Sequence, residues 1–244
     1  MLGALLLVGA TIILGIQQKE NRLVSDINIE IEAIADSKPL ISTEDVYTII
    51  QKHTGFDIDR AALKNYAPDQ IEALLNKDKR IKGANVYFGK DNQMYVYIEQ
   101  RDPIVRVDVT DGADFYLDSE GEAIPVSGST VLRLPVATGN IDAYTADYQE
   151  QAQNNLNDVY QLALKISEDD MLRPLIEQIH LDTKSEIVMV PKLGRSKILL
   201  GTTFGLDEKM DKLKIYYKKG VKRVGLDRFS EINLRYEGQI VGIK

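Results

Sequence analysis

The first sixteen residues form an uncharged and almost wholly apolar run, MLGALLLVGATIILGI, that does not recur elsewhere in the chain. A helix of this length rises roughly 24 Å, against a bilayer hydrocarbon core of about 30 Å. We therefore predict that residues 1–16 are a transmembrane anchor with a water-soluble body behind it. A secretory signal peptide is the alternative, but it needs a basic stretch before the apolar run and a small-residue cleavage site after it.

The side of the membrane on which the body lies is not fixed by local charges. Lys19 and Arg22 follow the apolar run, which by the positive-inside tendency favours a cytoplasmic body. The body itself has the composition of a folded protein, because the chain is 44% hydrophobic and 27% charged. Since cysteine is absent, disulfides, thiolate metal sites and a cysteine nucleophile are all excluded.

The net charge of −7 argues against nucleic-acid binding by the body as a whole. The charge is uneven, however, and residues 207–223 form a basic segment with a net charge of +4. Its cations are Lys209, Lys212, Lys214, Lys218, Lys219, Lys222 and Arg223. This segment predicts a docking surface for an acidic partner or for lipid headgroups, and a solvated helix face is the alternative interpretation.

Residues 24–101 have the pattern of a small α+β domain. Isoleucines alternate with polar residues over 27–32, as in a half-buried strand. Ser42 and Asp45 have the spacing of a capping box for a helix that runs to about His53 and ends at Gly55. A second helix is predicted to begin at Pro68, and residues 86–88 and 94–98 are predicted to form a hairpin.

From residue 102 onward the pattern predicts a larger mixed β domain with flanking helices. Helices are predicted over about 148–166 and along the face formed by Leu206, Met210, Leu213 and Tyr217. The chain is expected to close with a hairpin whose two strands cover 231–236 and 239–243. The remaining strands are predicted at 104–109, 115–117, 123–126, 176–181, 186–190 and 197–200.

The sequence shows no recognisable catalytic or metal-binding pattern. The two histidines are isolated, and we expect His53 to cap a helix and His180 to lie on a solvated strand face. Together with the lack of cysteine, this makes zinc improbable. The acids at 111, 114, 118 and 120 miss the spacing of a calcium loop and are interpreted as turn residues. Asp169 and Asp170 are adjacent and point in different directions, so they offer no hydrolytic geometry.

The order of these segments resembles the bacterial cell-division family FtsQ/DivIB. The likeness covers nearly the whole body, and its segments occur in the family's order. These segments are GFDI at 55–58, IKGANV at 81–86, YIEQRDPIV at 97–105, FYLDSEG at 115–121, LPVATG at 134–139, ILLG at 198–201, EKMDKL at 208–213 and INLRY at 232–236.

The resemblance implies an α+β protein with three parts: a transmembrane anchor (1–16), a POTRA-type domain (24–101), and a β domain with C-terminal partner-binding strands (102–244). It implies a single-pass protein of the cell inner membrane with its body on the periplasmic side. It also implies a non-enzymatic scaffold of the divisome that recruits and links other division proteins at the septum. The implied partners are FtsB-like and FtsL-like coiled-coil proteins and the bilayer, with no cofactor, nucleic acid or small-molecule substrate.

The resemblance places the partner-binding residues on the closing strands of the chain. The guanidinium of Arg235 would bind an acidic side chain of the partner, and Tyr236 would make a flat amphipathic contact. Gly238 would leave room for close approach of the partner backbone. Lys209 and Lys212 of the basic segment lie beside them in this interpretation. The alternative is that Tyr236 fills the core and Arg235 pairs with a neighbour.

Two other functions compete with the scaffold. One is an envelope-anchored hydrolase or transferase acting on cell-wall polymer, which would have to build its site from Asp, Glu and Ser. The other is a different POTRA-bearing protein, such as a secretion or outer-membrane assembly partner. Such proteins carry repeated POTRA units or a barrel, and the sequence shows one unit and no barrel period.

Overall fold

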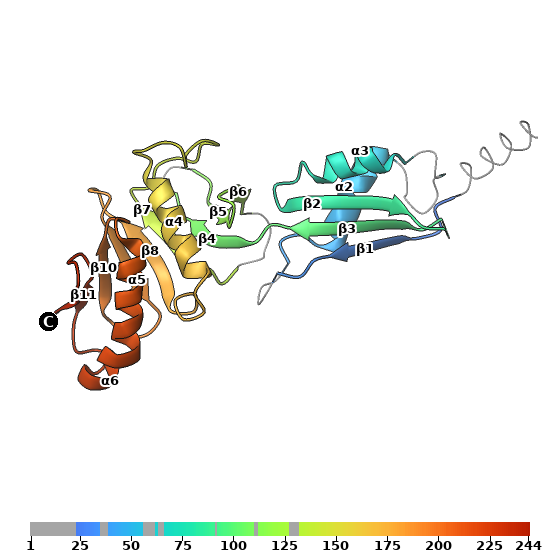
Figure 1. The fold of residues 1–244 in the computed structure, drawn as a ribbon. Helices are drawn as coiled ribbons and strands as arrows, with labels where there is room; N and C mark the ends of the chain where they lie inside the picture. Colours follow the sequence, from blue (N-terminus) through green and yellow to red (C-terminus); the bar gives the residue numbers. More distant parts are fainter. Residues whose placement is uncertain are drawn as a thin grey trace, which may run out of the picture. The chain divides into compact units, whose positions relative to one another are not determined.

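The computed structural model of the chain describes residues 23–34, 39–55, 62, 66–90, 92–109, 112–126 and 132–244. It divides into two compact units, residues 1–101 and residues 102–244, and both mix helices with a sheet (Figure 1). The predicted α+β class is confirmed. The predicted anchor at 1–16 lies outside the described residues. Within the described part of the chain, no helix is both long enough and apolar enough to span a bilayer.

Unit 1 is built on a three-stranded sheet in the order β1-β3-β2, in which β1 runs parallel and β2 antiparallel to β3. Its elements are β1 (Ile27–Ile31), α2 (Thr43–Thr54), α3 (Pro68–Leu75), β2 (Ile81–Phe88) and β3 (Met94–Gln100). Both helices contribute to one core with the inward side chains of the sheet. The helices therefore cover one sheet face, and the other face is open.

Helix α2 begins and ends where the sequence predicts. The Ser42 hydroxyl accepts a hydrogen bond from the amide of Asp45 at 3.1 Å, and the Asp45 carboxylate accepts from the Ser42 amide at 3.0 Å. This reciprocal pair satisfies two of the amides that a helix start leaves without partners. Gly55 ends the helix in the left-handed region, with a φ of 69°.

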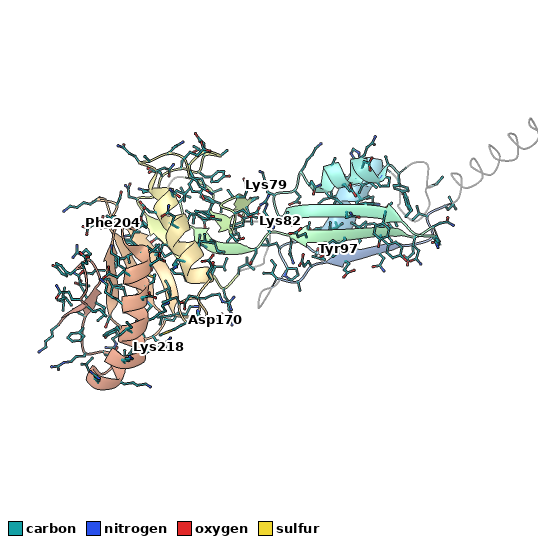
Figure 2. All side chains as sticks on the ribbon, in the orientation of Figure 1. Lys79, Lys82, Tyr97, Asp170, Phe204 and Lys218 are labelled. Atoms are coloured by element: carbon teal, nitrogen blue, oxygen red, sulfur yellow. The ribbon has the colours of Figure 1, made fainter. Side chains whose placement is uncertain are left out.

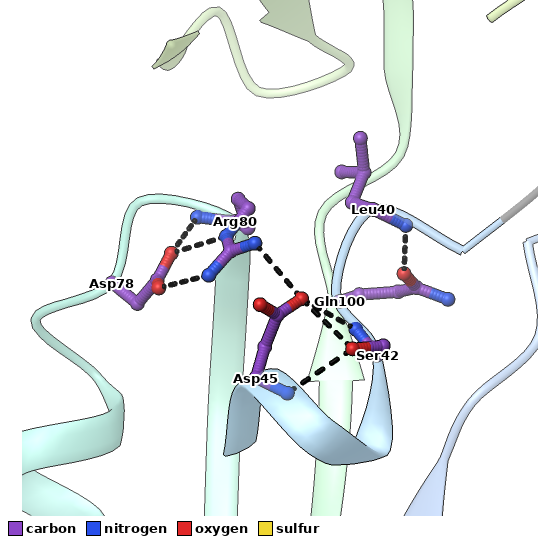
Figure 3. Close-up of polar contacts among 6 residues, drawn as sticks. All are labelled: Leu40, Ser42, Asp45, Asp78, Arg80 and Gln100. Atoms are coloured by element: carbon purple, nitrogen blue, oxygen red, sulfur yellow. Dashed lines mark hydrogen bonds and ion pairs between the residues drawn. The ribbon is translucent and has the colours of Figure 1, made fainter. Parts of the chain in front are cut away.

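Polar contacts hold the start of α2 against the sheet (Figure 3). Arg80 binds Asp45 at 3.2 Å and Asp78 at 2.8 Å. The hydrogen bond from the Ser42 amide is the main reason why the pKa of the Asp45 carboxyl lies below its ordinary value, and the Arg80 guanidinium lowers it further. The side chain of the buried Gln100 accepts from the amide of Leu40 at 2.8 Å. The segment before α2 is therefore fixed to β2 and β3.

Unit 2 contains a nine-stranded sheet, among the described residues, in the order β12-β11-β10-β9-β8-β7-β4-β5-β6. The strands are β4 (Pro103–Val107), β5 (Phe115–Asp118), β6 (Ala123–Pro125), β7 (Val136–Gly139), β8 (Ile176–Leu181), β9 (Ile187–Pro191), β10 (Lys197–Gly201), β11 (Glu231–Asn233) and β12 (Val241–Ile243). The helical segments are α4 (Asn155–Ser167), α5 (Leu206–Ile215), a π-helical segment (Tyr216–Gly220) and α6 (Val221–Val224). Helices α4 and α5 bury their apolar residues in a single core with the sheet (Figure 1).

Three differences from the sequence prediction concern helix α4, strand β7 and the closing strands. Helix α4 begins at Asn155 instead of near Tyr148, because the Asn154 side chain accepts from the amide of Leu156 at 3.0 Å and caps the helix there. Tyr148 instead lies buried in the preceding turn segment. Strand β7 was not predicted. The closing strands are shorter than expected, because β11 ends at Asn233 and β12 begins at Val241.

The capping box of α2 gives a direct test of this description. We expect Ser42→Ala to lower the free energy of unfolding by about 1 kcal/mol, because the amide of Asp45 loses its acceptor. Urea denaturation of the purified chain measures the loss. Ser42→Thr keeps the hydroxyl and is the matched control, so an equal loss in both variants would contradict the assignment of this cap.

Candidate partner-binding site

The predicted site residues gather around the start of helix α5 and the loop that joins β11 to β12. Together with the end of β10 they form a groove of about 480 Å³. Lys209, Lys212 and Arg235 line this groove. Tyr236 and Gly238 belong to the same loop but are not among its lining residues. The structure thus brings together residues that are up to 29 positions apart in the sequence, 209 and 238 being the extremes.

Lys209 and Lys212 bind groups of the same chain. They are therefore not part of the free basic surface that the sequence had led us to expect. Lys209 is only 9% exposed, and its ammonium donates to the carbonyl of Thr202 at 2.7 Å. The pKa of Lys209 is lowered mainly by burial of its ammonium and, to a smaller extent, by the charge of Lys212. The Lys212 ammonium donates to the carbonyl of Tyr236 at 2.6 Å and to that of Leu234 at 3.3 Å. Both lysines therefore hold loops in place.

Arg235 is exposed and lies across the end of strand β10. Its guanidinium pairs with the carboxylate of Glu186 at 2.9 Å, and its amide donates to the Asn233 side chain at 3.0 Å. Gly201 makes this arrangement possible, since it has a φ of 75° and a Cβ there would lie 2.8 Å from Cγ of Arg235. The arginine side chain thus packs directly on backbone, with its charged end at the surface.

Tyr236 and Gly238 lie in the turn that follows β11. The Tyr236 side chain is 50% exposed, so it does not fill the core. The Gly238 amide donates to a carboxylate oxygen of Glu208 at 2.9 Å, and the same oxygen lies 3.3 Å from the Lys212 ammonium. The Gly238 amide, and then Lys212, holds the pKa of Glu208 below its ordinary value. Helix α5 therefore binds this loop through one carboxylate and one ammonium.

The expected partner-facing strand is shorter than predicted. Arg235, Tyr236 and Gly238 were placed on it, but they follow β11 as irregular and turn residues. Strand β12 pairs antiparallel with β11 and is the last strand of the sheet, with no second neighbour among the described residues. An extended peptide could therefore pair with the outer side of β12.

The sequence interpretation missed Phe204 and Glu186. Phe204 also lines the groove and is 89% exposed, the highest value among the large hydrophobic residues described (Figure 2). Residues 201–205 have the sequence GTTFG. An aromatic residue enclosed by glycines on a loop is the signal that was available. Glu186 had no sequence signal, because its pairing with Arg235 spans 49 positions.

The residues weighed for catalysis have ordinary surroundings. His53 and His180 are exposed, and Nδ1 of His180 lies 3.0 Å from the Thr138 hydroxyl. Asp169 accepts from the amides of a tight turn and pairs with Lys214 at 3.0 Å, while Asp170 faces solvent. Within the described ranges no three His, Cys, Asp or Glu side chains gather as a metal site would require.

A family model described as FtsQ/DivIB, C-terminal related, matches residues 102–243, which is nearly all of unit 2 and more than half of the chain. No curated protein matches the sequence.

The contact between Gly201 and Arg235 predicts unequal effects at two glycines with similar backbone angles. Gly205 has a φ of 65°, and a Cβ there would meet nothing within 4 Å. We expect Gly205→Ala to cost about 1 kcal/mol of unfolding free energy, from the left-handed backbone alone. Gly201→Ala should cost about 1–3 kcal/mol more, because Arg235 must also move. Denaturant unfolding measures both, and equal losses would contradict the packing described.

The Glu208 carboxylate predicts a pH-dependent loop. Because its pKa is lowered in the folded state, its contacts are fully present above the pKa of an unfolded glutamate and are lost as the pH falls through the lowered value. The amide resonance of Gly238 should therefore titrate below the ordinary range of a glutamate. Heteronuclear NMR follows this shift, and Glu208→Gln should abolish it. A Gly238 resonance that titrates identically in the variant would contradict the contact.

Proposed function

The chain belongs to the FtsQ/DivIB C-terminal related family, and we propose that it is a non-enzymatic scaffold of the bacterial divisome. Membership of this family links the chain to cell division. In the proposal, the protein recruits and links other division proteins at the septum and makes or breaks no covalent bond. Its partners are coiled-coil membrane proteins of the FtsB and FtsL type, and it needs no cofactor, nucleic acid or small-molecule substrate.

The proposal rests on the open edge of β12, which follows the loop that lines part of the 480 Å³ groove. An extended partner segment would pair with the backbone of β12, and backbone pairing supplies affinity. The side chains around the groove would supply specificity. Phe204 and Tyr236 are exposed aromatic residues of the kind that dominate binding energy at protein interfaces.

Arg235 gives the site its preference for an acidic partner. Its pair with Glu186 is well exposed on both sides, at 39% and 43%, and such a pair is worth little to stability in water. A carboxylate brought by a partner would be desolvated on binding and would compete for the guanidinium. Lys209 and Lys212 take a positioning role in this proposal. Lys212 holds the loop that carries Arg235 and Tyr236, and Lys209 holds the loop before helix α5 through the carbonyl of Thr202.

The remaining parts of the chain have supporting roles in the same proposal. Residues 1–16 would anchor the protein in the cell inner membrane, and residues 24–101 would form a POTRA-type domain on the periplasmic side. The three-stranded sheet with two helices on one face supports that domain assignment. The β domain at 102–244 would then present the C-terminal site to partners in the periplasm.

Charge insertion at Tyr236 tests the proposed site. We expect Tyr236→Glu to weaken co-purification of the acidic coiled-coil partner by about tenfold or more, because the variant removes an aromatic contact and repels the partner. The chain should remain folded, since half of the side chain is exposed. Quantitative pull-down and thermal unfolding are the two measurements.

Two variants serve as controls for this test. Tyr87 of unit 1 is 53% exposed, so Tyr87→Glu makes the same change on a similar surface and should leave partner binding intact. Tyr236→Phe keeps the ring and should bind nearly as the native chain does. Unchanged binding by a folded Tyr236→Glu variant would refute the site.

A further inference from the structure

Strand β1 forms an edge of the unit 1 sheet that carries the features of a second strand-binding site. It pairs with β3 alone among the described residues. Alternate residues of a strand direct their backbone groups to opposite sides. The Met94 amide donates to the carbonyl of Asp26, and the Glu32 amide donates to that of Ile98. The even-numbered residues of β1 thus face β3, and the backbone groups of Ile29 and Ile31 point to the open side.

An apolar groove accompanies this edge on the helix-covered side of the sheet. Its volume is about 400 Å³. Apolar lining residues come from β1 and from the chain on either side of the segment at 35–38: Ile29, Ile31, Ala33, Ile34, Pro39 and Ile41. Glu32, Ser42, Thr43 and Gln100 complete the lining. A strand added to β1 would direct every second side chain into this groove.

The outer wall of the groove is held in place before any partner arrives. Figure 3 shows Gln100, at the end of β3, bonded to the amide of Leu40, and its side-chain amide also donates to the carbonyl of Glu32. Gln100 is only 6% exposed. The capping box of Ser42 and Asp45 fixes the next residues. A preformed wall lowers the ordering cost that a bound segment must overcome.

The opposite face of the same edge is acidic. Glu30 and Glu32 are exposed there, and neither pairs with a lysine or arginine of the described chain. The Tyr97 hydroxyl donates to the Glu32 carboxylate at 3.2 Å and orients it (Tyr97 is labelled in Figure 2). Lys82 of strand β2 pairs with Glu99 of β3 at 3.2 Å. The other set of alternate side chains in an added strand would therefore meet negative charge.

We propose that β1 binds an extended segment of a partner polypeptide in which apolar side chains alternate with lysine or arginine. The apolar side chains occupy the groove, the basic ones lie beside Glu30 and Glu32, and the backbone pairs with Ile29 and Ile31. This site lies wholly in unit 1 and is independent of the function proposed for unit 2. Acidic side chains on an edge strand can also simply prevent pairing, and the test separates the two.

Synthetic peptides about seven residues long, the length of an ordinary strand, are suitable probes. One alternates lysine with valine, one alternates glutamate with valine, and one has the lysine and valine in separate blocks. The full chain is purified in detergent, and binding is followed by calorimetry and by NMR shifts of residues 27–31. We expect the alternating lysine peptide to bind with shifts in β1, and the other two to bind at least about tenfold more weakly.

Two variants locate the site. Glu30→Lys should weaken the binding of the lysine peptide by about tenfold or more. Glu44→Lys makes the same charge change at an exposed position of helix α2 and should alter binding less than about twofold. Ile29→Pro removes an outward amide that the sheet does not use, so the chain should fold and the peptide should not bind.

The outcome is decisive in each direction. If the lysine peptide fails to bind, Glu30 and Glu32 only protect the edge and the proposal is wrong. Equal binding of all three peptides, or equal effects of Glu30→Lys and Glu44→Lys, would also overturn it. If Ile29→Pro does not fold, the charge pair of variants still decides the matter.

Discussion

A strand at the end of a sheet has backbone partners on one side only, and this constraint governs what the surface of each unit can do. Within the described ranges the two sheets have four such ends, and two of them are blunted. Strand β6 ends in Pro125, which has no amide to donate, and β2 carries a bulge between Ile81 and Gly83. Strands β1 and β12 lack these devices. A groove lies beside β1, and a second groove lies at the end of β10 and the loop that leads from β11 to β12.

The lysines of the basic segment illustrate why net charge alone does not define a binding surface. Lys209, Lys212 and Lys214 supply three of its seven cations, and the structure directs them to carbonyl groups or carboxylates of the same chain. A buried ammonium needs such partners because losing water is costly. What remains available at the C-terminal site is the guanidinium of Arg235, whose planar fork suits a carboxylate better than a scattered set of ammonium groups.

Local signals predicted the parts of the fold that short-range contacts decide. The cap at Ser42, the stop at Gly55 and the start at Pro68 depend on residues within a few positions, and all three are confirmed. Strand β7 was missed because its neighbours are β4 and β8, which lie far away in sequence. The groove at the C-terminal site could not be predicted for the same reason, since the contact of Gly201 with Arg235 has no local sequence signal.

The two proposed sites differ in the charge that they offer, and this difference would keep their partners apart. At the C-terminal site the exposed guanidinium of Arg235 would favour an acidic segment over a basic one. At β1 Glu30 and Glu32 reverse the preference. Backbone pairing is the same for any sequence, so it cannot discriminate between partners. Because like charges at an interface cost several kcal/mol, each proposed site would reject a segment suited to the other, and the two sites would then take different partners.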